Sequence, residues 1–309
     1  MKLTEGVPTP DVDFARLRNR LRQHVRALAE EIGERNVWRA EALDRAAAYL
    51  ETSLRTFGYS VSRQEYRARG ELVRNLEATL TGTRNPSSLI VSAHYDSAIG
   101  CPGANDNATG IAAMLEIATA CAGRSFASTL RFVAFVNEEP PFFQTDDMGS
   151  LVYARSLSER QQPVSGMLSL ETIGCYSTVR GSQAYPFPLG PLYRSTGDFI
   201  AFVTNRKSRS FLQRLTAVFQ QQTTLPFQAA ALPAFVPGVA WSDHWAFWQQ
   251  GFPGVMITDT GPFRYPHYHS SNDTPDKIDY ETLTQLVAAL SRTVLALAAA
   301  GEPTIQGSR

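Results

Sequence analysis

The sequence predicts an α/β fold: a three-layer sandwich in which helices flank both faces of a mixed, mostly parallel central sheet. Short apolar runs alternate with helical stretches, and the runs are apolar throughout rather than at every second residue. Strands buried on both faces have this pattern, and parallel sheets covered by helices contain such strands. The apolar runs are 88–93, 129–136, 165–170, 198–203 and 253–258, and the helical stretches are 108–122, 149–160, 208–221 and 276–299.

The segment before these runs is predicted to form two helices within 11–57, followed by a pair of strands. Apolar residues recur at helical spacing up to Gly33, which ends the first helix, and the second helix is expected over 38–57. Residues 60–67 and 72–81 alternate between apolar and polar side chains, which is typical of antiparallel strands.

Two stretches rich in proline, glycine and aromatic residues, 174–197 and 222–241, are predicted to be long loops beside the active site. Loops of that length are often functional. No internal repeat or low-complexity segment divides the chain. We therefore predict a single domain over 1–309.

The charge balance gives no general attraction to a polyanion. The 309 residues include 29 Lys+Arg and 29 Asp+Glu, so the formal net charge is zero, and neither nucleic acid nor a membrane surface is an expected partner. The first residues lack a signal-like apolar run, and no stretch has the pattern of a membrane span. We expect a cytoplasmic protein, or an exported one if a signal segment has been removed. The residues favour no particular oligomeric state.

Acidic and histidine residues directly follow three of the apolar runs. They are His94, then Glu138 and Glu139, and then Glu171. Ligands bind beyond the carboxyl ends of strands in such sheets, so these side chains are expected to meet there. Asp96 lies two residues beyond His94, where it can accept the second ring N–H of that imidazole.

Two further candidate ligands lie outside the apolar runs. Asp106 lies in the turn GANDNATG, where it could cap a helix or bridge two cations with its two oxygens. His269 lies in PHYHSSNDTPD, with His267 as the alternative. Asp273, in the same segment, either supports a ligand or caps a helix that starts near Pro275.

These candidates suit a site for two zinc ions, because two histidines and three carboxylates are suitable zinc donors and one carboxylate can bridge. Such a nitrogen and oxygen site would also accept other divalent ions, such as cobalt or manganese. Of Glu138 and Glu139, one can bind metal while the other acts as general base, and the residues alone allow either assignment. No GxSxG, P-loop, HExxH or CxxC motif competes. Asp243 and His244, in SDHWAFW, either line a substrate loop or begin a helix.

Taken in order, the fragments HYD, GANDN, NEE, LETIG and YHSSNDT make the chain similar to the co-catalytic zinc aminopeptidase family, over about residues 70–295. That family also includes glutamate carboxypeptidases and single-zinc glutaminyl cyclases. The loops EEPPFFQTDDMGS and SDHWAFWQQGFPGVMITDT resemble a bacterial subgroup. The resemblance implies an aminopeptidase fold and release of residues from a peptide with a free N-terminus.

The resemblance also implies that each zinc ion has its own imidazole and carboxylate. His94 and Glu171 would bind one Zn²⁺, and Glu139 and His269 would bind the other. Asp106 would bridge the two ions. Many members have aspartate at the Glu171 position, so the longer glutamate is a departure that affects the geometry at that ion.

The same resemblance implies that Glu138 activates water between the metals and that Asp96 orients His94. Arg264 could instead contact a substrate carboxylate, which would favour a carboxypeptidase or dipeptidase. A glutaminyl cyclase and a non-catalytic peptide-binding module are further alternatives, and the extra ligand in HYD argues against the cyclase. The aromatic residues that could shape an apolar substrate pocket are Phe142, Phe143, Trp245 and Phe263.

Overall fold

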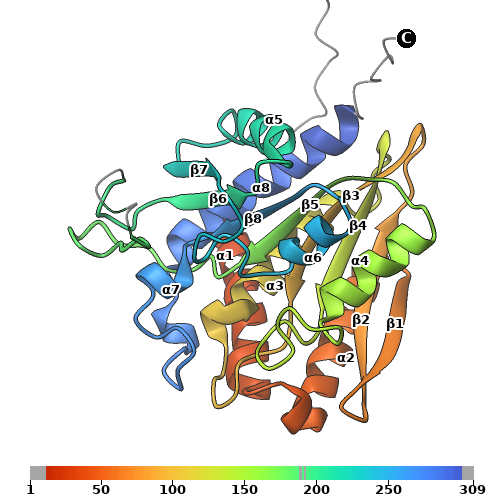
Figure 1. Cartoon of the computed structure of the whole chain (residues 1–309), viewed down its shortest axis with the longest axis horizontal. Coiled ribbons are helices and arrows are strands. Elements are labelled where there is room, and N and C mark those ends of the chain that lie inside the picture. The colour runs from red at the N-terminus through yellow and green to blue at the C-terminus, as the bar shows by residue number, and fades with distance from the viewer. Residues whose placement is uncertain (1–11, 188–189, 191–192, 301–309) are drawn as a thin grey trace, which may run out of the picture.

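Eight strands form one sheet, in the order β1-β2-β4-β3-β5-β8-β6-β7 (Figure 1). The computed structural model describes residues 12–187, 190 and 193–300. Position 11 of the predicted helical segment and positions 188–189 and 191–192 of the predicted loop 174–197 therefore lie outside the described residues. The strands are β1 (Val61–Ala68), β2 (Glu71–Leu80), β3 (Asn85–His94), β4 (Ser128–Phe135), β5 (Val164–Glu171), β6 (Ile200–Thr204), β7 (Phe227–Ala231) and β8 (Gly254–Thr258).

The predicted mixed, mostly parallel sheet is confirmed. The pairs β3–β4, β3–β5, β5–β8 and β6–β7 are parallel, whereas β1–β2, β2–β4 and β6–β8 are antiparallel. The neighbouring strands β4, β3, β5 and β8 thus end at the same edge of the sheet. That shared carboxyl edge is where ligands bind in sheets of this kind.

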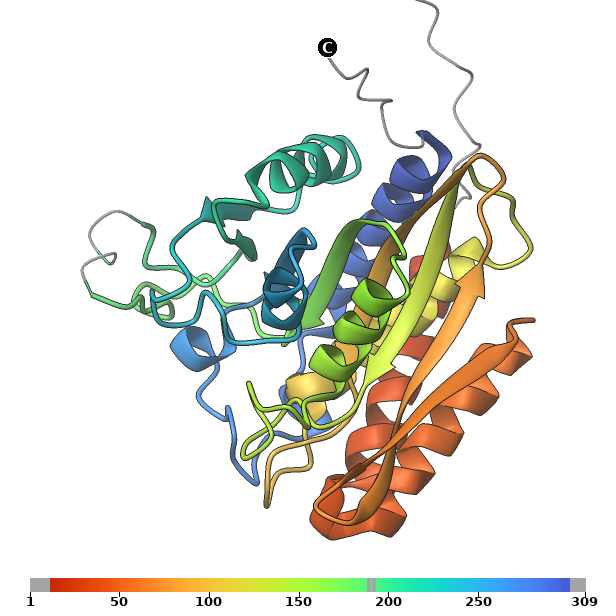
Figure 2. The same ribbon diagram turned by 45° about the vertical axis from the view of Figure 1, so that its right-hand side comes forward.

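Helices cover both faces of the sheet. Figure 2 shows α4 and α6 in front of the sheet and α8 with the N-terminal helices behind it. The predicted N-terminal helices are present, the first continuing from α1 into a π-helix, Ala27–Ile32. The helices are α1 (Phe14–Arg26), α2 (Ala40–Thr56), α3 (Gly110–Cys121), α4 (Gly149–Glu159), α5 (Arg209–Phe219), α6 (His244–Gln249), α7 (Gly261–Arg264) and α8 (Tyr280–Ala300).

The continuous apolar runs arise because each central strand is buried on both faces. In β3, Val91 belongs to the larger hydrophobic cluster with α1, α2, α3 and α8, whereas Ile90 belongs to the cluster with α4 and α6. In β4, Phe132 and Val133 divide in the same way. Successive side chains point to opposite faces of a strand, so both sets must be apolar.

The stretch 222–241, predicted as a loop, contains the short strand β7. Its sequence, FQAAA, is mostly alanine, and β7 lies at one edge of the sheet. Alanine is depleted in strands, so local sequence gave no signal for this element. Pairing with β6 provides the order that composition did not indicate.

Among the described helices, α8 is long and apolar enough to span a membrane by length and composition. Inspection of the sequence had identified no such stretch. However, 67% of its most apolar window is buried inside the fold, where Leu286, Val287 and Leu290 join the larger hydrophobic cluster. A core helix has this pattern of burial.

Candidate metal centre

Three strands bring four of the predicted residues to one edge of the sheet. His94 is the last residue of β3 and Glu171 the last of β5, while Glu138 and Glu139 follow β4 closely. All four are buried. The parallel register of β4, β3 and β5 therefore gathers side chains that lie far apart in the sequence.

Asp106 reaches the same place from the turn before α3. It does not cap that helix, because Asn107 accepts the N–H of Gly110 instead. The Asp273 side chain holds the turn in place by accepting hydrogen bonds from the N–H groups of Asn105, at 2.8 Å, and Asp106, at 3.0 Å. Of the two roles predicted for Asp273, the structure shows support of a candidate ligand.

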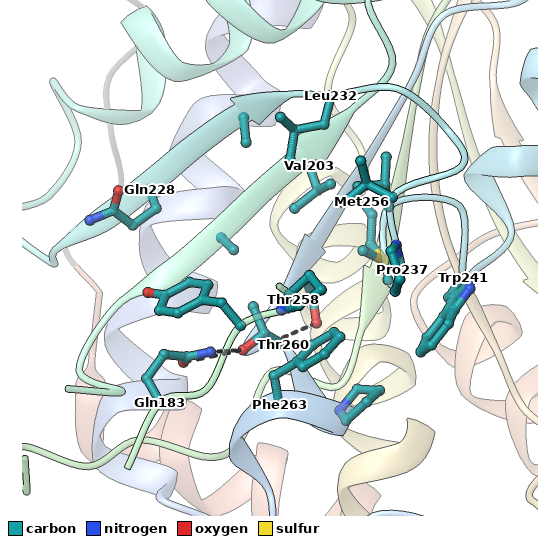
Figure 3. A pocket seen from close by; sticks show the side chains of 18 of the residues that line it. Gln183, Val203, Gln228, Leu232, Pro237, Trp241, Met256, Thr258, Thr260 and Phe263 are labelled. Atoms are coloured by element: carbon teal, nitrogen blue, oxygen red, sulfur yellow. Dashed lines mark hydrogen bonds between the residues drawn. The ribbon is translucent and has the colours of Figure 1, made fainter. Parts of the chain in front are cut away.

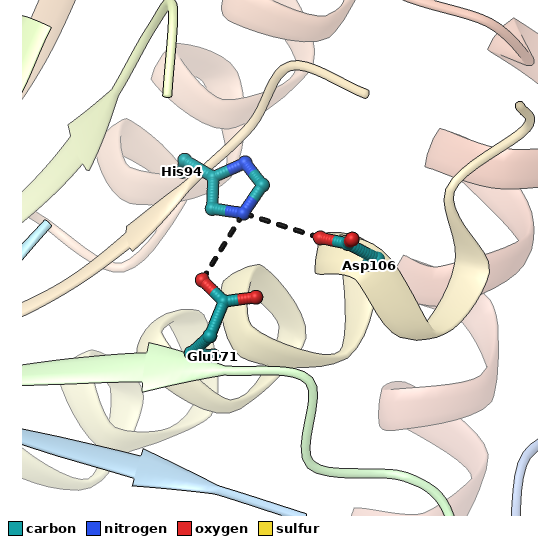
Figure 4. Close-up of side chains that lie close together, drawn as sticks. All are labelled: His94, Asp106 and Glu171. Atoms are coloured by element: carbon teal, nitrogen blue, oxygen red, sulfur yellow. Dashed lines mark ion pairs between the residues drawn. The ribbon is translucent and has the colours of Figure 1, made fainter. Parts of the chain in front are cut away.

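Asp106 stands between two imidazole–carboxylate groups. Its Oδ1 lies 3.3 Å from His94 Nε2, which is also 3.3 Å from Glu171 Oε2 (Figure 4). Its Oδ2 lies 3.1 Å from His269 Nε2, which is also 3.1 Å from Glu139 Oε2. One carboxylate thus presents one oxygen to each group, as a bridge between two cations requires.

The donors fit two cations. Within each group, one candidate atom per residue lies within 4.8 Å of the others. Both ring nitrogens of His94, Asp106 Oδ1 and Glu139 Oε1 are buried without a hydrogen-bond partner. Leaving such atoms unpaired is costly, and imidazole nitrogen with carboxylate oxygen is a typical zinc donor set.

Burial and the close approach of these side chains shift the pKa values of Glu139 and His269. Burial raises the pKa of Glu139 to about 7, and the charge of Asp106 adds to that rise. Burial opposes the charged form of His269, but hydrogen bonds with Asp106 and Glu139 outweigh it and raise its pKa to about 10. Metal ligands must be deprotonated, so cation binding here would release protons.

Asp96 ties His94 to the Glu138–Glu139 pair. Its Oδ1 accepts the N–H of Glu138 at 3.2 Å, and its Oδ2 accepts the N–H of Glu139 at 3.1 Å. The same Oδ1 lies 3.5 Å from His94 Nδ1. The buried side chain of Asp96 therefore helps to fix the position of the His94 imidazole and of the backbone at Glu138 and Glu139.

Glu138 does not belong to either imidazole–carboxylate group. Its Oε2 lies 3.8 Å from His94 Nε2, whereas Glu139 is in direct contact with His269. Burial raises the pKa of Glu138 well above its ordinary value, although His94 opposes the rise. The geometry favours Glu139 as ligand and leaves Glu138 beside the cluster.

Comparison with known proteins identifies the family. The sequence model of Peptidase family M28 matches residues 75–294.

The chain belongs to peptidase family M28.

The relatives agree with that assignment. The protein YfbL of Escherichia coli is 36% identical over 276 residues, covering 86% of this chain and 84% of YfbL. A probable zinc metalloprotease of Pyrenophora teres is 25% identical over 236 residues, which is 70% of this chain but 47% of that protein. This chain therefore spans about half the length of that relative. Family membership implies a zinc-dependent hydrolase that acts on peptides.

Solved structures share the fold. A zinc aminopeptidase from Bacillus subtilis aligns with a TM-score of 0.72 at 16% identity, covering 90% of this chain and 94% of that one. A glutaminyl cyclase from Fimbriiglobus ruber aligns with a TM-score of 0.71 at 21% identity, covering 95% and 97%. At these identities the likeness is one of architecture, and it confirms the predicted three-layer fold.

The structure adds two residues of this M28 peptidase that sequence reasoning did not select. Ser242 donates to Glu171 Oε2 at 2.8 Å, and its hydroxyl also meets Ser169 Oγ at 3.0 Å. The ring of Tyr268 stacks on His269 with centroids 3.9 Å apart. Adjacency to His269 was a signal for Tyr268, but nothing in the sequence connects Ser242 with Glu171.

Asp243 and His244 lie at the start of α6 but have different environments. Asp243 makes no capping hydrogen bond and is buried, and burial raises its pKa to about 7, with His94 opposing. His244 forms a 2.8 Å hydrogen bond with the carbonyl of Val239 and packs on Trp248. Of the two alternatives predicted for this pair, the structure shows the start of a helix, with Asp243 at its first turn and His244 bonded to the preceding loop.

Arg264 and His267 lie outside both donor groups. Arg264 is buried and donates to Gln183 Oε1 and to the Phe199 carbonyl, each at 2.7 Å, so its guanidinium ties loops to the sheet. The contact of Arg264 with a substrate carboxylate, offered as an alternative, stays a prediction. His267 packs against Tyr265 rather than joining either donor group.

An apolar groove begins at the metal centre and runs across β8 and β6 to β7 (Figure 3). It encloses about 840 Å³, part of it open to solvent. Glu171 and Tyr268, which belong to or contact the candidate ligand groups, are among its lining residues, and so are Trp241 and Phe263, whose rings stack. Of the four aromatic residues expected here, Phe263 lines the groove. Phe142, Phe143 and Trp245 pack against the hydrophobic clusters instead.

Proposed function

We propose that this M28 peptidase is a two-zinc aminopeptidase that releases neutral, apolar residues from the free N-terminus of peptides. The observation that supports this most is the bridging position of Asp106 between the groups His94–Glu171 and Glu139–His269. Two zinc ions held there would lower the pKa of a water molecule and polarise the scissile carbonyl.

Glu138 is the general base of the proposed reaction. Its carboxyl group is buried beside the cluster, and burial raises its pKa, which makes its charged form a stronger proton acceptor than an ordinary glutamate. It takes the proton of the attacking water and then donates it to the leaving amine, because the same group must serve both steps. Asp96 keeps Glu138 in place through the backbone hydrogen bond described above.

The groove supports a free N-terminus as the substrate feature. Glu171 is the one charged residue among the described residues that line it. An α-ammonium group beside the metal centre would therefore lie near the Glu171 carboxylate, whereas no lysine or arginine among the described lining residues could pair with a substrate carboxylate. This favours an aminopeptidase over a carboxypeptidase. The apolar walls favour a neutral first side chain, because burying a charge without a partner is costly.

The first experiment is mass spectrometry of a peptide pool incubated with zinc-loaded protein, together with measurement of bound zinc. The pool contains free, N-acetylated and N-terminal glutamine peptides. We expect stepwise loss of N-terminal residues from the free peptides alone, with two zinc ions per chain. Protein with Glu138→Gln is the matched control for contaminating peptidases.

Other outcomes overturn the proposal in distinct ways. Loss of ammonia from the glutamine peptides would indicate a glutaminyl cyclase, and trimming from the other end would indicate a carboxypeptidase. Tight peptide binding without zinc or turnover would indicate a binding module.

A further inference from the structure

One arginine from the N-terminal helical segment contacts the loop that joins two of the candidate metal ligands, His94 and Asp106. Arg35 follows the π-helix Ala27–Ile32, outside the region 75–294 that matches the family. It has no exposed surface. Among the described residues, Arg35 and Arg264 are the only buried lysines or arginines. A buried guanidinium is costly unless its donors and its charge are matched, so its surroundings indicate what it does.

The guanidinium of Arg35 donates to five main-chain carbonyls. Two of them, Leu28 and Gly33, belong to its own segment. The other three belong to the segment that joins His94 to Asp106, namely the carbonyls of Tyr95 at 2.7 Å from Nε, of Gly103 at 2.8 Å from Nη2, and of Pro102. A rigid fork of five N–H groups can hold both ends of a loop at once, which a lysine ammonium cannot do.

The backbone around Arg35 fixes the same segment. Ser97 donates its N–H to the Arg35 carbonyl at 2.9 Å, and its hydroxyl accepts the Arg35 N–H at 3.1 Å. Gly103 has a φ of +67° and passes so close that a Cβ there would lie 3.1 Å from Arg35 Nη2 and 2.4 Å from the Asp106 carbonyl oxygen. The loop thus passes directly over the guanidinium.

The charge of Arg35 complements the acids of the centre. Burial lowers its pKa to about 10, while the charges of Asp273, Asp96, Asp106 and Glu139 oppose that fall. Arg35 therefore remains a cation at neutral pH, and it is not among the described residues that line the groove. Its positive charge stabilises ionised carboxylates, which is the form that a metal requires.

We propose that Arg35 is a positioning residue of the metal centre, through which the N-terminal helical segment sets the separation of His94 and Asp106 and so the affinity for zinc. This inference rests on the metal centre proposed above, but it does not depend on which peptide bond is cleaved. The hydrogen bonds of the Arg35 guanidinium all go to main-chain carbonyls, so it acts through the loop that it holds and through its charge.

The test measures zinc affinity by competition with a chelator, for the wild type and for Arg35→Met, Arg35→Lys and Arg20→Met. Arg20 is the control, because this arginine of α1 pairs with a buried acid, Glu116 of α3, and not with the segment that joins His94 to Asp106. We expect Arg35→Met to bind zinc about 10- to 100-fold more weakly, as loss of an outer support usually does. Arg35→Lys should lie in between, since it keeps the charge, and Arg20→Met should match the wild type.

Two further readouts separate positioning from simple destabilisation. The visible spectrum of the cobalt-substituted protein should change in Arg35→Met but not in Arg20→Met, because it reports the arrangement of the ligands. At saturating zinc, Arg35→Met should lower kcat and leave KM for the peptide unchanged, because Arg35 does not line the groove. If Arg35→Met does not fold, Ser97→Ala loosens the same segment and should weaken zinc binding in its place.

Folded Arg35→Met with the zinc affinity and cobalt spectrum of the wild type would overturn this proposal. Wild-type protein that binds no zinc would overturn the metal centre as well. Zinc-loaded wild type that leaves free N-termini intact would overturn the proposed aminopeptidase activity alone, and the affinity comparison would still decide the role of Arg35.

Discussion

Asp273 Oδ2 accepts the backbone N–H of Asp106 at 3.0 Å, although the two residues lie 167 positions apart in the chain. Asp273 is buried, also accepts the N–H of Asn105, and receives the hydroxyl of Tyr265 at 2.8 Å. A single carboxylate therefore holds the turn that presents the proposed bridging ligand.

Asp273→Asn should weaken zinc binding about 10- to 100-fold, because an amide would place a donor against one of the two backbone N–H groups. Chelator competition measures the effect. Asp276→Asn is the control, since Asp276 is exposed and pairs with Lys277 on the surface. Equal zinc affinity in both variants would show that the turn keeps its shape without Asp273.

Glu138→Gln should keep both zinc ions and lose activity by a factor on the order of 10² to 10⁴, which is the usual contribution of a general base. Its neighbour provides the comparison: Glu139→Gln should lose metal, because Glu139 contacts His269. Zinc content and peptide turnover are measured on the same samples. Retained turnover in Glu138→Gln, or metal loss there and not in Glu139→Gln, would reverse the two assignments.

His269→Ala should lower the zinc content, whereas His267→Ala should leave it unchanged. His269 Nε2 lies 3.1 Å from both Asp106 and Glu139, while the ring of His267 packs against Tyr265. Elemental analysis of the two purified variants distinguishes them. Zinc loss confined to His267→Ala would mean that the loop is arranged differently in the working enzyme.

Ala230→Phe should reduce cleavage of peptides that begin with a large aromatic residue about tenfold or more relative to peptides that begin with alanine. Ala230 lines the groove from β7, so the added ring would occupy space for the first side chain. Ala229→Phe is the control, because Ala229 is exposed and does not line the groove. An unchanged ratio of kcat/KM values in Ala230→Phe would place the first side chain elsewhere.

His244 should make the folded protein less stable in mild acid. Burial lowers its pKa from 6.5 to about 4, so between these values the unfolded chain binds a proton that the folded chain does not. Its contribution to stability is complete above pH 6.5 and is lost as the pH falls toward 4. Between pH 7 and pH 5, the free energy of unfolding should fall by about 2 kcal/mol less in His244→Gln than in the wild type.

Urea unfolding at the two pH values measures this difference. Trp248→Phe is the control, because Trp248 packs on His244 but does not titrate in this range. It should lower stability equally at both pH values relative to the wild type. An identical pH dependence in His244→Gln and the wild type would show that His244 is protonated without cost in the folded state.

The sequence was most informative where a strand ends. His94 and Glu171 terminate β3 and β5, and an apolar run followed by a single polar donor is visible without a structure. Such runs must be buried on both faces, so the position of the donor at the shared carboxyl edge follows from the parallel sheet. The grouping of ligands around Asp106 also agrees with the family resemblance.

The parts that sequence did not predict depend on contacts between distant segments. Ser242 reaches Glu171 across 71 positions, and Arg264 is buried by contacts with Gln183 and Phe199. Neither pairing has a local pattern. β7 was missed for a related reason, because an alanine-rich edge strand is ordered by its neighbour and not by its own composition.

The packing of α1 against α8 bears on how the polypeptide is made. The last described helix supplies much of the larger hydrophobic cluster, and α1 and α3 rest on it. A growing chain that has emerged only as far as β8 lacks this helix, so the apolar side of the sheet that α8 covers remains open to water. Long-range closure of this kind slows folding and leaves intermediates prone to aggregate. We therefore expect nascent chains to depend on chaperones until α8 has emerged from the ribosome.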